Sequence, residues 1–241
     1  MSAPTIRQRV GRWVLACVPL ERDLIDRLRH SARGLSVRAR YALLPTWRAR
    51  ARALRAERDV LLNVGSGPFP MAGFLNLDVI AFTPDVVPWD CTHSLPLADG
   101  AAHGIRAEHL LEHLEPRAQV PHFLAECRRA LAPGGVLRVI VPDMGAYLRA
   151  YVADGDTALS AIGVPVPFPA DLPCRMDVVA HAFHQWHEHR WGYDAESLMH
   201  RLRAAGFHEV RTASYARGRD ARLAVDRDEH RAYSLYVEGV A

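Results

Sequence analysis

The chain has 241 residues, and 49% of them are hydrophobic, which suffices for a buried core and excludes a disordered chain or a small disulfide-stapled fold. All 30 basic residues are arginines. Residues 1–58 carry 14 arginines against 4 acids, a net charge of +10, whereas the remaining residues carry 16 against 23, a net charge of −7. This asymmetry argues against a uniformly basic nucleic-acid-binding domain.

The sequence predicts a cytoplasmic protein. No stretch approaches the ~18–20 apolar residues of a membrane span. The apolar run 13–20 is too short before Cys17 to form a signal peptide. The four cysteines form no CxxC pair and no regular framework, so they are interpreted as reduced thiols.

Residues 5–58 are predicted to be helical because apolar residues recur at helical spacing. Pro19 and Gly34 are expected to interrupt the helices, and an arginine-rich helix is expected over 47–57. The segment is interpreted as a basic helical extension, separate from the domain that begins at residue 59.

From residue 59 to 241, short apolar runs alternate with longer amphipathic ones, which is typical of an α/β domain. The predicted parallel-sheet strands are 59–64, 73–78, 84–89, 104–107 and 136–141. The predicted helices are 116–131 and a helix capped by Asp194 that ends at Gly206. Residues 143–193 hold several prolines and are expected to form an irregular lid or substrate-side insertion. The segments 210–214 and 231–240 are expected to close the sheet as an antiparallel pair.

A glycine turn follows the first predicted strand, and an acid ends the second. Gly65 and Gly67 allow the backbone to approach a ligand, and Asp78 can accept hydrogen bonds from both hydroxyls of a ribose. The arrangement predicts an adenosine site, with a strand-end turn as the alternative role for Asp78. Pro70 stands in place of the third glycine of a dinucleotide fingerprint, which disfavours a nicotinamide dehydrogenase.

Five segments in chain order resemble the successive motifs of class I S-adenosylmethionine (SAM) dependent methyltransferases. They are residues 62–67, 74–78, 95–100, 108–114 and 129–135. The chain is most similar to the type 11-like branch with a short first crossover, often found with glycan and natural-product biosynthesis. The resemblance implies a Rossmann-like α/β fold, with a mostly parallel seven-stranded sheet and helices on both faces, to which the N-terminal helical extension is added.

The same resemblance implies SAM as the cofactor. The residues implied to bind it are Asn63, Gly65, Ser66, Gly67, Asp78, Asp90, Cys91, Glu108 and His109. Among them, Asp78 would hold the ribose hydroxyls and His109 would lie near the methyl group. The Asp/Asn-Pro-Pro-Tyr/Phe motif of amino-group methylation on nucleic-acid bases is absent after the fourth strand, which disfavours nucleic acid as the acceptor.

Histidines and tryptophans gather in the 143–193 insertion. The candidates for a general base toward a hydroxyl acceptor are His184, His187, His189 and His109. Trp186 and Trp191 are candidate walls of an acceptor pocket, and packing within a lid is the alternative role for all of these residues. The imidazoles could converge on Zn²⁺, but their spacing is not HExxH, so no metal site is predicted.

The sequence therefore predicts a SAM-dependent methyltransferase that acts on a hydroxyl of a sugar, glycan or other small molecule in biosynthesis. The alternatives are a non-catalytic module that binds SAM or a partner, and an RNA methyltransferase steered by the N-terminal arginines. The basic segment 1–58 is interpreted as a helical cap on the domain. The other reading is a surface for a phosphate-bearing acceptor or for anionic lipid on the inner membrane face.

Overall fold

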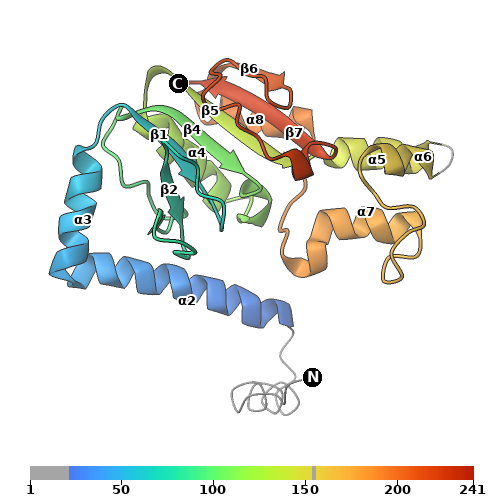
Figure 1. Ribbon diagram of the computed structural model, residues 1–241, viewed down its shortest axis with the longest axis horizontal. Helices are drawn as coiled ribbons and strands as arrows, with labels where there is room; N and C mark the ends of the chain where they lie inside the picture. The colour runs from blue at the N-terminus through green and yellow to red at the C-terminus, as the bar shows by residue number, and fades with distance from the viewer. Residues whose placement is uncertain (1–21, 154–155) are drawn as a thin grey trace, which may run out of the picture.

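The computed structural model describes residues 22–153 and 156–241, so the helix expected before residue 22, with Pro19, lies outside the described residues. Its centre is a seven-stranded sheet with the order β3-β2-β1-β4-β5-β7-β6 (Figure 1). Neighbouring strands are parallel, except that β7 runs antiparallel to both β5 and β6. The strands are β1 (Val60–Val64), β2 (Leu75–Asp78), β3 (Val86–Pro88), β4 (Ala102–Glu108), β5 (Leu131–Pro142), β6 (His208–Ala213) and β7 (Ser234–Val240). The predicted fold class is confirmed.

Helices flank and connect the strands. They are α2 (Arg22–Leu43), α3 (Pro45–Ala56), α4 (Gln119–Ala130), α5 (Met144–Val152), α6 (Thr157–Ala161), α7 (Arg175–His184) and α8 (Ala195–Ala204), with the short turns η1 (Leu111–His113), η2 (Gln185–His187) and η3 (Asp228–His230). The predicted cap of α8 is confirmed, because the Asp194 side chain accepts a hydrogen bond from the backbone N of Ser197 at 2.8 Å. Gly206 follows the helix with a φ of +89°, a conformation that suits glycine.

The sheet has one apolar and one polar face, because successive residues of a strand point to opposite sides. Side chains of the strands, α4 and α8 form the apolar core; they include Leu62, Ile105, Val139, Phe123 and Leu202. On the other face, neighbouring strands place polar residues at matching register positions: Asn76, Asn63, Arg106, Arg138 and Glu238. The segment 214–233 covers part of this polar row, and backbone carbonyls of Ser214 and Arg217 accept hydrogen bonds from Arg138.

The expectation of an irregular insertion over 143–193 is wrong, because α5, α6 and α7 occupy much of it. The insertion has a small apolar cluster of its own, formed by Ala150, Leu159, Val164 and Val178. These helices bury apolar side chains against one another, and the prolines lie in the loop between α6 and α7, where they interrupt no helix. Asp143 begins α5 by accepting a hydrogen bond from the backbone N of Ala146 at 3.0 Å.

The expected interruption at Gly34 is also wrong, because α2 continues through it. Gly34 is buried, and a Cβ at this position would lie 2.7 Å from Asp90 Oδ2. The glycine therefore serves close packing of α2 against the residue that follows β3, rather than a helix end. Figure 1 shows α2 crossing the carboxyl-terminal side of β2.

The helices α2 and α3 are joined to the domain by buried side chains. Val37 and Leu54 are buried, and Leu54 belongs to the main core. The Tyr41 ring lies between two tryptophans, with ring centroids 4.9 Å from Trp47 and 4.5 Å from Trp89. None of the described helices is long and apolar enough to cross a membrane.

Candidate functional site

The turn after β1 carries the first group of predicted SAM residues. Gly65 and Gly67 have φ angles of +69° and +54°, which favour glycine. The backbone N of Gly65 donates to Leu77 O at 2.8 Å and holds the turn against β2. Asp78 Oδ2 accepts from the backbone N of Gly67 at 3.0 Å, and Oδ1 accepts from Ile80 N at 2.9 Å. A Cβ at residue 67 would meet no atom within 4 Å, so the turn is open to a ligand beside the Asp78 carboxylate.

A cavity of about 230 Å³ lies between this turn, β4 and the segment 225–227. Its lining includes four of the predicted cofactor residues: Asn63, Gly65, Ser66 and Glu108. The Asn63 side chain is held from the next strand, because its Nδ2 donates to Asn76 Oδ1 at 3.0 Å. The structure thus brings the predicted glycine turn and the end of β4 to one cavity.

Asp90 and Cys91 follow β3 and lie near Asp78. Burial raises the pKa of the Cys91 thiol to about 12, and the charges of Asp90 and Asp78 add to this rise, so the thiol is neutral. Asp90 Oδ1 accepts from Thr92 N at 3.1 Å and from Thr92 Oγ1 at 2.6 Å. Asp90 Oδ2 lies 3.3 Å from Arg38 Nε, so α2 covers this carboxylate.

His109, just after β4, is held by protein contacts on both ring nitrogens and has a φ of +50°. Its Nε2 lies 3.0 Å from Ser234 Oγ, and its Nδ1 lies 3.4 Å from Glu112 Oε1. Its ring stacks on His230 with a centroid separation of 4.0 Å. Burial and the charge of His230 lower the pKa of His109 to about 3, so the imidazole is neutral and weakly basic near pH 7.

Beside His109, the structure brings together Glu112 and His113 of η1 with His189, which follows η2. Burial raises the pKa of the Glu112 carboxyl to about 8. Burial lowers the pKa of His189 to about 4, and it also lowers the pKa of His113. The buried surroundings of these groups disfavour the charged form of each one. Sequence reasoning did not link His113 with His189, because no local pattern along the chain connects them.

The other histidine candidates face solvent. His184 ends α7, His187 lies in η2, and both side chains are exposed. Trp186 and Trp191 are 62% and 46% exposed. The predicted histidine candidates therefore divide: His189 is buried beside His113, and His109 is largely buried, whereas His184 and His187 are accessible to a ligand from solution.

Buried ion pairs under the segment 214–233 were missed by sequence reasoning. Glu108 accepts a hydrogen bond from Arg106, and its Oε1 lies 3.1 Å from His230 Nδ1. Burial alone would raise the pKa of Glu108, but the His230 hydrogen bond and the Arg106 charge lower it to about 2. Arg138 is fully buried and pairs with Asp226 in the same layer. The two-residue spacing of Arg106 and Glu108 on one strand was the available signal, since it places both on one face.

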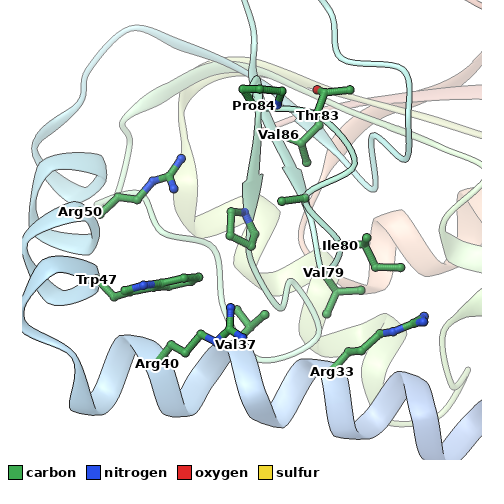
Figure 2. Close-up of a pocket in the computed structure, with 12 residues that line it drawn as sticks. Arg33, Val37, Arg40, Trp47, Arg50, Val79, Ile80, Thr83, Pro84 and Val86 are labelled. Atoms are coloured by element: carbon green, nitrogen blue, oxygen red, sulfur yellow. The ribbon is translucent and has the colours of Figure 1, made fainter.

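A second cavity, of about 450 Å³, lies between α2, α3 and the residues that follow β2 (Figure 2). Figure 2 shows Arg33 and Arg40 on α2 and Trp47 and Arg50 on α3 around it, opposite Ile80. The Arg40 guanidinium carbon lies 5.3 Å from the centroid of the Trp47 ring. Arg33, Arg40 and Arg50 line this cavity, and among the side chains that the structure describes no carboxylate pairs with Arg33 or Arg50.

Comparison with known proteins gives the following similarities. The family model described as "Methyltransferase domain" matches residues 75–139. No curated protein matches the chain.

Several solved structures are similar at low identity. A SAM-dependent methyltransferase from Archaeoglobus fulgidus is 15% identical, with a TM-score of 0.44, and the match covers 87% of this chain and 94% of that one. A possible histamine N-methyltransferase from Thermotoga maritima is 17% identical, with a TM-score of 0.45 and coverages of 79% and 86%. The 1,6-didemethyltoxoflavin-N1-methyltransferase from Burkholderia thailandensis, solved with its substrate and S-adenosylhomocysteine, is 17% identical, with a TM-score of 0.43 and coverages of 100% and 92%.

Proposed function

We propose that the chain is a class I SAM-dependent methyltransferase that methylates a hydroxyl of a sugar, glycan or other small molecule. The strand order and the match of residues 75–139 to a methyltransferase domain support this proposal. The observation that carries the proposed site is the contact between the glycine turn and the acid of β2. The backbone N of Gly67 donates to Asp78 Oδ2 at 3.0 Å, and the space beside Gly67 is open.

In this proposal the turn of Gly65 and Gly67 lies along the methionine and ribose of SAM, and Asp78 accepts hydrogen bonds from the ribose hydroxyls. Asn63, Ser66 and Glu108 support this wall of the site. Their side chains share the cavity beside the turn. Asp90 and Cys91 lie at the adenine end, where α2 covers Asp90 through Arg38.

Methyl transfer needs an acceptor oxygen about 3 Å from the methyl group, in line with the sulfur–methyl bond, and a site from which water is excluded. The oxygen forms its bond to the methyl carbon as the sulfur–methyl bond breaks, and S-adenosylhomocysteine leaves. The proton of the hydroxyl passes to a base. In this proposal the acceptor is flanked by α2 and the α5–α7 insertion.

The base is proposed to be one of the histidines of the insertion. A base works best when its pKa lies near the working pH. Burial lowers the pKa of His109 to about 3 and that of His189 to about 4, which disfavours both as the base. His184 and His187 are exposed, so an acceptor can reach them from solution. The exposed rings of Trp186 and Trp191 suit the apolar faces of a sugar.

The test is methyl transfer from labelled SAM to a panel of hydroxyl-bearing sugars, glycans and small molecules. The proposal expects release of S-adenosylhomocysteine that depends on the acceptor, with a mass increase of one methyl group on an oxygen. Tight SAM binding without transfer to any acceptor would favour the non-catalytic alternative. Transfer to RNA, with a steep dependence of RNA binding on salt, would favour the RNA methyltransferase.

Single substitutions His184→Ala, His187→Ala and His189→Ala locate the base. At the base position turnover is expected to fall by about 10²–10⁴-fold while SAM affinity is kept, because general-base catalysis contributes on that order. If all three variants keep full turnover, a histidine of the insertion is not the base.

A second role is favoured for the basic helices, and the arginine-lined cavity of Figure 2 supports it. Arg33 and Arg50 lack an acidic partner within the described residues, and Trp47 lines the same cavity. We propose that this cavity binds a phosphate group, either of the acceptor or of an anionic lipid. Sedimentation with phosphatidylglycerol vesicles tests the lipid, and competition by inorganic phosphate or a phosphorylated sugar tests the acceptor. Loss of binding in Arg33→Gln and Arg50→Gln is expected, and no binding of any of these probes would contradict the role.

A further inference from the structure

Three side chains form a compact group next to His109, and the proposed function favours other histidines, His184 and His187, as the base. Glu112 lies in η1, His113 ends it, and His189 follows η2. Each offers one potential ligand atom, and these atoms all lie within 4.8 Å of one another. Glu112 is 1% exposed and His189 is 7% exposed, so the group is in the interior.

Three buried polar atoms of this group lack hydrogen-bond partners among the described residues. Neither carboxylate oxygen of Glu112 has a hydrogen-bond partner among the described residues, and neither has Nε2 of His189. The closest approach to Glu112 is His109 Nδ1, at 3.4 Å from Oε1. A buried carboxylate without partners is costly, so a proton or a cation is needed to stabilise it.

The two rings of the group are oriented by backbone carbonyls. His113 Nδ1 lies 3.0 Å from Glu188 O, and His189 Nδ1 lies 2.9 Å from Ala182 O. A carbonyl oxygen can only accept, so Nδ1 is the donor in each ring and Nε2 keeps its lone pair. This arrangement is typical of metal-binding histidines, whose second nitrogen is held by a carbonyl or carboxylate.

Backbone hydrogen bonds fix the two segments that supply the group. Arg190 N and Trp191 N donate to Glu112 O at 2.7 Å and 3.2 Å. The rings of His113 and His189 contact each other with a centroid separation of 5.0 Å. The three side chains are therefore positioned relative to one another by the fold, before any ligand binds.

We propose that Glu112, His113 and His189 bind one divalent transition-metal ion, with Zn²⁺ as the best chemical match. Two imidazoles and one carboxylate are a ligand set that Zn²⁺ accepts, with bonds of about 2.0–2.2 Å. Such bonds place ligand atoms roughly 3.3 Å apart in a tetrahedron, so atoms that now lie within 4.8 Å of one another must approach by at most about 1.5 Å. Three protein ligands leave a fourth position for water or an oxygen of another molecule. The site does not depend on the identity of the acceptor and goes beyond the proposed function.

The test uses the untagged full-length chain, freed of metal by a chelator and titrated with Co²⁺ and Zn²⁺. The proposal expects one ion per chain, Co²⁺ absorption bands typical of a four-coordinate site with nitrogen ligands, and displacement of Co²⁺ by Zn²⁺. His189→Ala and Glu112→Gln are expected to weaken binding by at least about 100-fold, since each removes one of three ligands. His187→Ala is the matched control, because this exposed imidazole is two residues from His189 and is expected to leave binding unchanged.

Unfolding of the metal-free variants, followed by circular dichroism, shows whether each one is folded. If Glu112→Gln does not fold, anomalous diffraction from a Co²⁺-soaked crystal of the wild-type chain locates the ion instead. The proposal is overturned if the wild-type chain binds no ion. It is also overturned if the ion lies elsewhere, or if His189→Ala binds as tightly as the wild type. In those cases a proton on Glu112 satisfies the buried group. These readouts are independent of methyl transfer, so they separate failure of the metal site from failure of the proposed function.

Discussion

At the residue scale, the chemistry of this protein depends on carboxylates and imidazoles whose surroundings differ over short distances. Asp78 is held by two backbone N–H groups and lies beside open space. Glu108 is paired with Arg106 and His230, whereas Glu112 is buried without a hydrogen-bond partner among the described residues. The three carboxylates therefore have different roles: Asp78 is a proposed ligand for ribose, Glu108 is part of an ion pair and Glu112 is a proposed metal ligand.

Replacing Asp78 by Asn is expected to weaken SAM binding by roughly 10–100-fold, because a hydrogen bond to a charged group contributes about 1.5–3 kcal/mol. Isothermal titration calorimetry measures the affinity. Asp85→Asn is the control, because Asp85 is an exposed carboxylate in the same region. Equal SAM affinity in the wild type and in Asp78→Asn would contradict the ribose assignment.

The ion pair of Glu108 predicts a specific acid dependence of stability. Burial opposes ionisation, but His230 and Arg106 lower the pKa of Glu108 from 4.5 to about 2. A carboxyl whose pKa is lower in the folded state stabilises the fold above the unfolded value, and this contribution is lost as the pH falls from 4.5 toward 2. The contribution is at most on the order of 3 kcal/mol.

Urea unfolding at several pH values measures the loss. Glu108→Gln is expected to be less stable than the wild type at pH 7 and to lose less free energy of unfolding between pH 4.5 and 2. The exposed Glu196→Gln is the control and is expected to follow the wild type. A wild type and a Glu108→Gln variant with parallel pH profiles would show that Glu108 is not stabilised by its ion pair.

At the element scale, α2 is held by one close contact. Gly34 lets the helix approach Asp90, and Arg38, one turn later, pairs with the same carboxylate. The conformational cost of a glycine inside a helix is therefore offset by packing that any side chain would prevent. This contact also places the basic helix next to the proposed adenine end of the SAM site.

Gly34→Ala is expected to lower the thermal stability, although alanine has the higher helix propensity by about 1 kcal/mol. The added Cβ would lie 2.7 Å from Asp90 Oδ2, so α2 or the Asp90 side chain, which Thr92 and Arg38 hold, must shift. Ser36→Ala, at an exposed position of the same helix, is the matched control and is expected to leave the melting temperature equal or slightly higher. A rise of the melting temperature in Gly34→Ala would disprove the close packing.

At the scale of the whole molecule, the described part of the basic segment, residues 22–58, is packed on the acidic domain by apolar contacts. Leu54 of α3 lies in the main core, and Tyr41 of α2 contacts Trp89 after β3. These contacts support the interpretation of residues 22–58 as a helical cap. They are compatible with the proposed phosphate role, because the arginines of Figure 2 lie on the side of the cap that faces the second cavity.

Leu54→Ala is expected to reduce the free energy of unfolding by about 2–4 kcal/mol, since a buried leucine is lost and a cavity remains. Leu35→Ala is the control, because Leu35 is 61% exposed on α2 and its loss is expected to change stability by less than about 0.5 kcal/mol. Denaturant unfolding at equilibrium measures both. Equal stability of the two variants would mean that the helical cap is energetically separate from the domain.

The sequence by itself determined the features that depend on neighbours along the chain. Alternating apolar runs specified the strands, the glycines specified the turn after β1, and Asp194 specified the start of α8. All of these are short-range signals, because backbone conformation and side-chain period are set by adjacent residues. The order of these signals was enough to predict the fold class and the pairing of the glycine turn with Asp78.

The tertiary structure alone decided which distant side chains meet. Glu112 and His113 are separated from His189 by α4, β5 and most of the insertion, and contacts of the segment 188–191 with Glu112 and His113 bring them together. Tertiary packing likewise brings Arg38 of α2 to Asp90 and Arg138 of β5 to Asp226, and both pairs are far apart in the sequence. Burial then sets the protonation of these groups, since desolvation depends on the whole packed interior and leaves no local pattern in the chain.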